Sequence, residues 1–146
     1  MTLTSEKVAD LRLKHLEMLQ AVVLRMSSNS ATVRNYCITL TSAVVGVSLT
    51  VQRPVGALLA LIIAAFCALL DAQYLRLERR FRCLYDKSRE EGFDVLPTFE
   101  IKLSSAPIIK FRSVLLSWHI GFFYVPLIIC IIATLAITWW SYGRII

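Results

Sequence analysis

The absence of charge over three long stretches limits what this chain can fold into. Eighteen residues between Arg34 and Arg53 carry no charge, and seventeen more follow in 54–70. Residues 113–143 form a third run of thirty-one, in which His119 is the only titratable side chain besides tyrosine and cysteine. A helix needs about 20 mostly apolar residues to cross a hydrocarbon core of roughly 30 Å, whereas soluble cores use periodic mixtures. The sequence therefore predicts an all-α membrane protein with three transmembrane helices.

The charges that remain fall mostly on one side of these runs. Fourteen of the sixteen Lys and Arg side chains precede the first run or lie between the second and third, and only Arg53 and Arg144 lie elsewhere. By the positive-inside rule, the N-terminus is cytoplasmic and the C-terminus external. A net charge of +6 would favour nucleic-acid binding in a soluble chain. Here the positive charge is explained by membrane topology, which places Lys and Arg on the cytoplasmic side, and by attraction to the anionic inner leaflet. We therefore expect the lipid bilayer, and no nucleic acid, as partner.

The pattern divides the chain into five parts. The second span continues into the cytoplasm without a helix breaker to about Glu91, so a basic stalk is predicted there. We expect a cytoplasmic amphipathic helix in 1–34, a transmembrane hairpin in 35–75 with spans at about 35–52 and 54–74, a basic cytoplasmic stalk and loop in 76–112, a third transmembrane helix in 113–143, and an external tail, 144–146.

Three local features concern the ends of these parts. The amphipathic helix, which lies on the inner membrane surface or packs on its own protein, is expected to break or bend at Ser27–Ser30. Residues 99–103 alternate in the manner of a short strand. Pro107 after two serines marks the start of the last helix, and Pro126 is expected to kink it.

Small side chains mark helix contacts in the hairpin. The first span places Thr39, Ser42, Gly46 and Thr50 on one face, and small or hydroxylated residues let membrane helices approach closely. The second span carries an uninterrupted small-residue ridge at four-residue spacing. The ridge packs either within the chain, against the Ser42/Gly46 face, or between subunits, and we favour the first. Its residues are Gly56, Ala60, Ala64, Ala68 and Ala72.

Asp71 and His119 are the ionisable residues, other than tyrosine and cysteine, that fall within the predicted spans. Charged groups at such depth are rare and commonly functional, so both are candidates for a pore or ligand site, together with Thr39 and Ser42. The alternative is that Asp71 sits in the wet interface and pairs with Arg76 or another nearby cation.

Four arginines follow Asp71 on the stalk. They anchor the helix by topology, bind anionic lipid headgroups, or bind an anionic signal such as a nucleotide through charge-assisted hydrogen bonds. All three interpretations remain open. The residues are Arg76, Arg79, Arg80 and Arg82.

Motifs of enzymes and metal sites are not found. The chain has no glycine-rich phosphate loop, no G-x-S-x-G and no H-E-x-x-H. Its four cysteines show no C-x-x-C spacing, so neither a disulfide framework nor a zinc site is predicted. We expect no enzymatic activity, no catalytic residues, no metal and no cofactor.

Two stretches resemble small bacterial membrane proteins encoded near antiviral systems: KHLEMLQAVVLRMSSNSATVRNYCITLTSAVVG at 14–46 and DAQYLRLERRFRCLYDKSRE at 71–90. The chain looks like the SLATT-like group of effectors and accessory membrane proteins of antiviral defence loci over about half its length. That group is described around a two-span unit with a cytoplasmic helical extension. This chain has a third predicted span and no separate sensor domain.

The resemblance implies a multi-pass protein of the bacterial inner membrane that permeabilises the membrane when a partner system detects phage. A single three-helix unit has no room for an aqueous path, so conduction requires a homo-oligomer. We therefore expect an ion-conducting or membrane-disrupting effector in antiphage defence, with a cytoplasmic defence protein or a nucleotide as its signal. The alternative is a non-conducting scaffold or accessory subunit that recruits a cytoplasmic defence complex.

Overall fold

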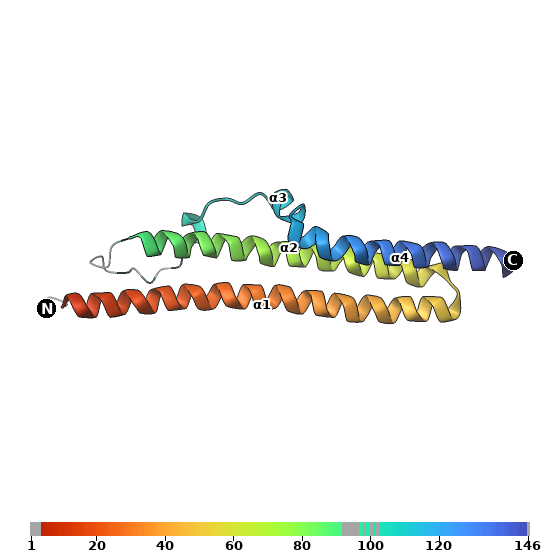
Figure 1. The fold of residues 1–146 in the computed structure, drawn as a ribbon, viewed down its shortest axis with the longest axis horizontal. Coiled ribbons are helices and arrows are strands. Elements are labelled where there is room, and N and C mark those ends of the chain that lie inside the picture. The colour runs from red at the N-terminus through yellow and green to blue at the C-terminus, as the bar shows by residue number, and fades with distance from the viewer. Residues whose placement is uncertain (1–3, 92–96, 98, 100, 102, 146) are drawn as a thin grey trace.

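The chain is all-helical and elongated (Figure 1). The computed structural model describes residues 4–91, 97, 99, 101 and 103–145. Within these ranges there is no strand, which confirms the predicted all-α class. The elements are α1 (Ser5–Val51), α2 (Pro54–Glu90), the short 3-10 helix η1 (Leu103–Ser105), α3 (Phe111–Leu115) and α4 (Trp118–Ile145).

α1 is one helix of 47 residues, about 70 Å long at 1.5 Å per residue. The predicted break at Ser27–Ser30 is wrong. Serine and asparagine lower helix propensity by less than about 0.7 kcal/mol each, and no proline interrupts the helix. Ser30 is also 5% exposed, because it packs against α2. Tertiary contact therefore overrides a weak local signal.

α1 and α2 form a long antiparallel hairpin (Figure 1). Their buried residues recur every three or four positions, which is the spacing of an interhelical seam. Ala60, Ala64 and Ala72 of the small-residue ridge have no exposed surface. The α1 residues in this seam are Val8, Arg12, His15, Leu19, Ser30, Cys37, Thr41 and Ser48.

The α1 face that meets the ridge is therefore not the Ser42/Gly46 face. Thr41 and Ser48 are buried, whereas Ser42 and Gly46 are exposed. A Cβ added to Gly46 would meet no atom within 4 Å. The ridge does pack within the chain, but the face around Gly46 points away from it.

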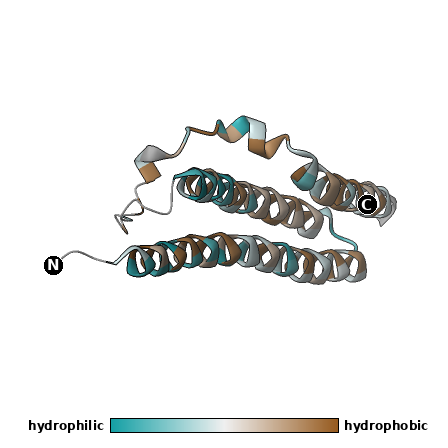
Figure 2. Cartoon of the chain, turned by 60° about the vertical axis from the view of Figure 1, so that its left-hand side comes forward, coloured by the Kyte–Doolittle hydropathy of each residue, from teal (hydrophilic) through white to brown (hydrophobic). Residues whose placement is uncertain are grey.

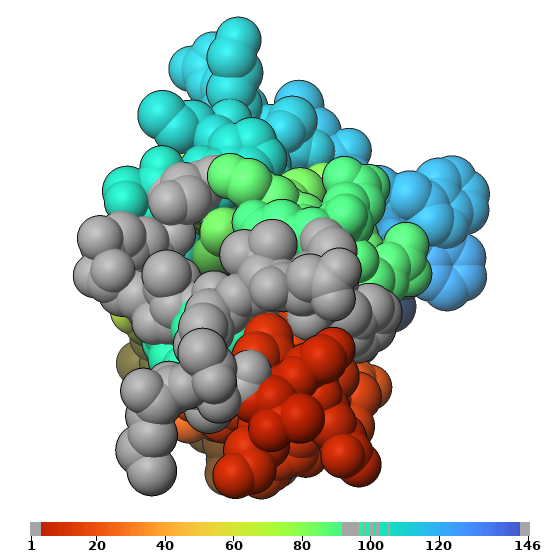
Figure 3. Space-filling view, turned by 90° about the vertical axis from the view of Figure 1, so that its left-hand side faces the viewer, coloured from red at the N-terminus to blue at the C-terminus, as the bar shows by residue number. Residues whose placement is uncertain are grey.

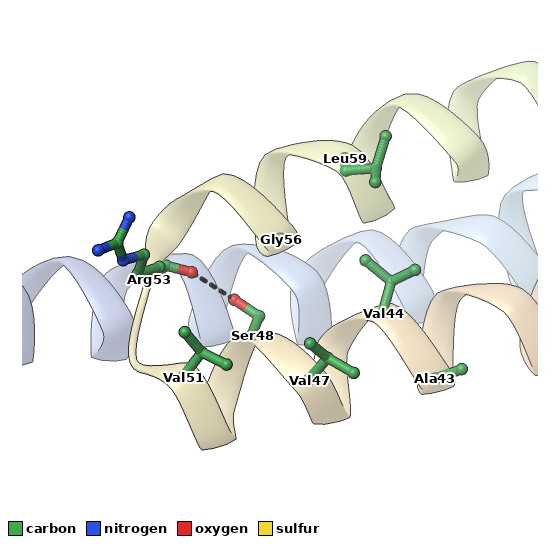
Figure 4. Close-up of a pocket in the computed structure, with 8 residues that line it drawn as sticks. All are labelled: Ala43, Val44, Val47, Ser48, Val51, Arg53, Gly56 and Leu59. Carbon is green, nitrogen blue, oxygen red and sulfur yellow. Dashed lines mark hydrogen bonds between the residues drawn. The ribbon is translucent and has the colours of Figure 1, made fainter.

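The hairpin turn is held by one side chain. Gln52 takes a left-handed conformation with φ 52°, and Ser48 Oγ donates to the Arg53 carbonyl at 2.7 Å (Figure 4). Pro54 occupies the first turn of α2, where its missing N–H is not needed. Because Gly56 has no Cβ, α2 can then pass close to Ser48.

The predicted third span is two helices rather than one. α3 ends at Leu115, and the carbonyl of Ser117 then accepts hydrogen bonds from the amides of Ile120 and Gly121 at 3.1 and 3.0 Å. α4 continues through Pro126 to Ile145 and packs mainly on α2. The strand predicted for 99–103 lies partly outside the described residues, and Leu103 begins η1.

Viewed from the N-terminal end, the hairpin and the α3 segment form three layers. α1 lies on one side of α2, and the segment containing η1 and α3 lies on the other (Figure 3). α2 is thus the central helix of the molecule.

Among the described residues, two helices are long and apolar enough to cross a membrane: α2, and α4 over Trp118–Gly143. Only 28% and 22% of their most apolar windows are buried inside the structure, whereas the core helix of a soluble protein is mostly covered. Figure 2 shows the apolar stretches at one end of α2 and along α4. The described part of the chain therefore contains two apolar helices compatible with membrane spans, and the uncharged half of α1, which is more polar, lies beside α2.

Replacing Gly56 by alanine tests the close approach of α1 and α2. The new Cβ would lie 2.7 Å from Ser48 Cβ, so we expect Gly56→Ala to destabilise the protein by about 1–3 kcal/mol through overpacking. Gly46→Ala, on the open face, should be neutral or stabilise by up to about 1 kcal/mol. Unfolding titrations in mixed micelles would measure both, and equal effects would contradict this packing.

Candidate functional site

A buried ion pair lies where α1, α2 and α4 meet. Asp71 on α2 has no exposed surface. Arg34 on α1 donates through Nε to Asp71 Oδ2 at 2.7 Å and through Nη2 to Oδ1 at 3.5 Å. Ser30, one turn earlier on α1, donates its hydroxyl proton to Oδ1. Both carboxylate oxygens are therefore satisfied from a neighbouring helix.

Arg34 also connects this pair to α4. Its guanidinium carbon lies 5.8 Å from the ring centroid of Phe123, within the range of a cation–π interaction. The Arg34 side chain keeps 25% of its surface exposed, so the charge is held at an edge of the bundle rather than at its centre. A partly hydrated guanidinium lowers the desolvation penalty of the pair.

Polar side chains continue from this pair along the helices. Cys37 of α1 and Cys67 of α2 are both buried in the cluster of side chains between these helices. Tyr124 of α4 is 3% exposed, and its hydroxyl has no partner among the described residues. An unpaired buried hydroxyl costs about 1–3 kcal/mol. The three helices thus enclose a small polar region in an otherwise apolar contact.

The predicted pore or ligand residues do not converge on one site. Asp71 pairs with Arg34 and not with Arg76 or His119. His119 is exposed at the start of α4. Thr39 and Ser42 are exposed on α1, where each hydroxyl donates to a carbonyl of its own helix, at 2.9 and 3.1 Å.

The four stalk arginines separate into two pairs with different surroundings. Arg76 Nε donates to the Ile109 carbonyl at 2.8 Å, and Arg80 Nη2 donates to the Leu103 carbonyl at 2.6 Å. These two hold the segment before α3 against α2. Arg79 and Arg82 instead line a pocket on the side of α2 that faces α1.

This interhelical pocket has a volume of about 330 Å³. Arg34 and Ser30 contribute from α1, Arg79 and Arg82 from α2, and His119 from α4. Arg82 forms an ion pair with the buried Glu78 at 2.7 Å. Arg79 has no hydrogen bond or ion pair to any described residue, which leaves a guanidinium group at the pocket wall.

Two further hollows lie along the hairpin. One of about 300 Å³ adjoins the interhelical pocket at Arg82 and reaches Gln20 and Asp86. The other, of about 370 Å³, is an apolar groove near the hairpin turn (Figure 4), lined by Ala43, Val44, Val47, Ser48, Val51, Arg53, Gly56 and Leu59.

Sequence reasoning did not find Ser30, Arg34 and Arg12. Arg12 is 3% exposed and bonds the Ser88 carbonyl at 2.7 Å and Glu91 Oε2 at 3.0 Å, so it joins the far ends of the hairpin. A signal for Arg34 existed: it lies at the boundary of the first uncharged run, four residues after Ser30 and hence on the same helix face.

No group of three metal-ligating side chains occurs in the part of the chain that the structure describes. The arrangement is one of ion pairs, an anion-compatible pocket and apolar grooves. No family model, curated protein or solved structure matches the chain.

Removing Asp71 would leave the Arg34 charge without its partner. We expect Asp71→Ala to destabilise the protein by about 3–5 kcal/mol and Arg34→Leu/Asp71→Leu to recover most of that loss. Asp86→Ala, at an exposed position of the same helix, should change stability by less than about 0.5 kcal/mol. Chemical unfolding in detergent would measure all three. A double variant as unstable as Asp71→Ala would argue against the pair.

Loss of the Arg76 hydrogen bond should loosen the segment before α4. Because a hydrogen bond from a charged donor contributes about 1.5–3 kcal/mol, Arg76→Gln should increase amide exchange at Ser113 and Leu116 by at least about tenfold. Arg79→Gln serves as the control, since Arg79 holds no carbonyl in this segment. Hydrogen–deuterium exchange with mass spectrometry measures the amide exchange of both variants. Equal exchange in Arg76→Gln and Arg79→Gln would contradict the role given to the Arg76 hydrogen bond.

Proposed function

We propose that this protein is a three-span protein of the bacterial inner membrane, with a cytoplasmic N-terminus, whose copies assemble around an ion-conducting or membrane-disrupting path. Its role would be that of an effector in antiphage defence. The resemblance to SLATT-like effectors supports the biological role, and the exposed surface of α1 supports the mechanism.

The observation that carries this proposal is a polar face that runs along the uncharged half of α1 and begins one turn before it. We call it the hydroxyl face, and all of its residues are exposed. It lies opposite the buried side of the same helix, represented by Cys37, Thr41 and Ser48. It carries no charge and no large apolar side chain. Its members are Thr32, Asn35, Thr39, Ser42, Gly46 and Thr50.

A face of this composition is unsuited to lipid tails. Thr39, Ser42 and Thr50 satisfy their hydroxyl protons by donating to carbonyls of their own helix, but their remaining lone pairs and the Asn35 amide need water or another helix. In membranes such faces lie against neighbouring helices or water-filled spaces.

The path must lie between copies. Inside one protomer, the contact between the uncharged parts of the helices is filled by two thiols and other buried side chains, and the Arg34–Asp71 pair lies at one end of it. The hydroxyl face is the extended uncharged polar surface at membrane depth, so an oligomer that turns it inward would line a lumen with hydroxyl groups.

Placement of three spans is supported by position and charge. The uncharged half of α1 runs beside the apolar part of α2, and α4 lies along α2 as well (Figure 1). Arg34, Asp71 and Arg76 lie together at one end of these stretches. Under the positive-inside rule this end is the cytoplasmic edge.

A non-conducting scaffold is the second candidate, and the cytoplasmic half of the hairpin favours it. α1 and α2 continue together beyond Arg34 to the Arg12 contacts with Ser88 and Glu91. This paired extension is a rigid surface on which a cytoplasmic defence protein could dock.

Reconstitution in dye-loaded liposomes tests conduction. We expect ion flux from the wild type and at least about a tenfold lower flux from Ser42→Leu. In the oligomer, the leucine of every copy would face the narrow lumen, and such an apolar constriction favours dewetting. Ala65→Leu is the matched control, since Ala65 is an exposed small residue of α2 away from the hydroxyl face. Phage challenge of cells that express each variant would report on defence.

The same preparation separates the two functions. Native mass spectrometry gives the subunit count of each variant. An oligomer that conducts, and loses flux only in Ser42→Leu, supports the channel. Absence of flux from a wild-type oligomer, or equal loss in both variants, would exclude it and favour the scaffold.

A further inference from the structure

We propose that the interhelical pocket binds the phosphodiester headgroup of an anionic phospholipid such as phosphatidylglycerol. This inference rests on the membrane placement proposed above but not on ion conduction. It concerns the pocket of about 330 Å³ formed by α1, α2 and the start of α4.

The charge around the pocket matches a monoanion. Three guanidinium groups, from Arg34, Arg79 and Arg82, meet the carboxylates of Asp71 and Glu78. With histidine counted as neutral, one net positive charge remains. A phosphodiester carries a single negative charge, whereas a phosphomonoester carries about −1.5 to −2 at neutral pH and a nucleoside triphosphate carries more.

Arg79 is the group that supplies this excess charge. Arg34 is occupied by Asp71 and Arg82 by Glu78, at 2.7 Å in each case. Arg79 has no partner among the described residues, although its side chain is half-buried at the pocket wall. A guanidinium presents donors in a planar fork that fits two phosphate oxygens.

A hydroxyl and an imidazole complete the pocket. The hydroxyl of Ser27 and the imidazole of His119 line it from two other helices. Hydrogen bonds from such groups would orient the ester oxygens or the glycerol hydroxyls of the headgroup.

The surroundings favour a lipid over a soluble phosphate. Trp118 and Phe122, beside His119, are 79% and 72% exposed and stack with ring centroids 5.9 Å apart. Tyr36, 64% exposed, follows Arg34 on α1. Aromatic side chains of this kind lie at the level of lipid headgroups, and basic pockets between helices on the cytoplasmic side bind anionic headgroups. The apolar surfaces below them would receive the acyl chains.

Native mass spectrometry of the protein released from vesicles of phosphatidylglycerol and phosphatidylcholine tests this proposal. We expect retained phosphatidylglycerol, and retention about tenfold weaker in Arg79→Gln, since one charge-assisted contact is lost. Arg25→Gln removes the same charge from an exposed position of α1 outside the pocket and should retain lipid as the wild type does. If Arg79→Gln and Arg25→Gln lost phosphatidylglycerol equally, the retention would depend on general surface charge, and the proposed site would be wrong.

Two further measurements make the result specific. Ser27→Leu keeps every charge but fills the mouth of the pocket, so it should also lower retention. Ser27→Leu therefore tests the pocket even if Arg79→Gln folds poorly. Glycerophosphoglycerol, the headgroup without acyl chains, and inorganic phosphate should compete weakly. If either compound bound as tightly as phosphatidylglycerol, the pocket would be a site for a soluble phosphate, and the lipid proposal would be wrong. Because Ser42 does not line the pocket, Ser42→Leu should change ion flux and not lipid retention. The two measurements therefore test the lipid site and the channel separately.

Discussion

The carboxylate of Asp71 is the charge around which the three long helices are arranged. A buried carboxylate is tolerated only when its desolvation is offset by hydrogen bonds and an opposite charge of good geometry. Ser30 and Arg34 supply both from α1, and Arg34 extends the connection to Phe123 of α4. The pair therefore sets the register of α1 against α2, because sliding either helix by one residue would leave a charge without its partner. It also separates the apolar half of the hairpin from the charged half.

The helical class and the long second helix could be predicted from the sequence, because uncharged runs and the absence of breakers between Pro54 and Glu90 are direct physical signals. The continuity of α1 through Ser27–Ser30 could not, since it depends on contact with α2. The interruption at Leu116–Ser117 was also missed. There the apolar pattern continues, and only the hydrogen bonds to the Ser117 carbonyl reveal a new helix start.

The site was foreseeable in its residue types but not in its pairings. Asp71 stood out as a carboxylate next to an apolar run, yet its partner is 37 positions earlier in the chain. The arginine cluster was evident as well. What the sequence could not show is that helix rotation sends Arg76 and Arg80 toward backbone carbonyls near α3 and leaves Arg79 and Arg82 at a pocket. Only the relative placement of α1, α3 and α4 around α2 distinguishes the two pairs.

The unbroken length of α1 has a mechanical consequence. Since no hinge interrupts Ser5–Val51, the helix moves as a stiff rod, with Arg34 close to two thirds of the way along it. About 45 Å of the rod then lies on the N-terminal side of that point and about 25 Å beyond it, at 1.5 Å per residue. Tilting the rod about the salt-bridged pivot would swing the two ends in opposite directions. A force applied at Arg12, about 33 Å from the pivot at 1.5 Å per residue, would therefore act on the Val51 end of α1 with a leverage of roughly 1.3 to one.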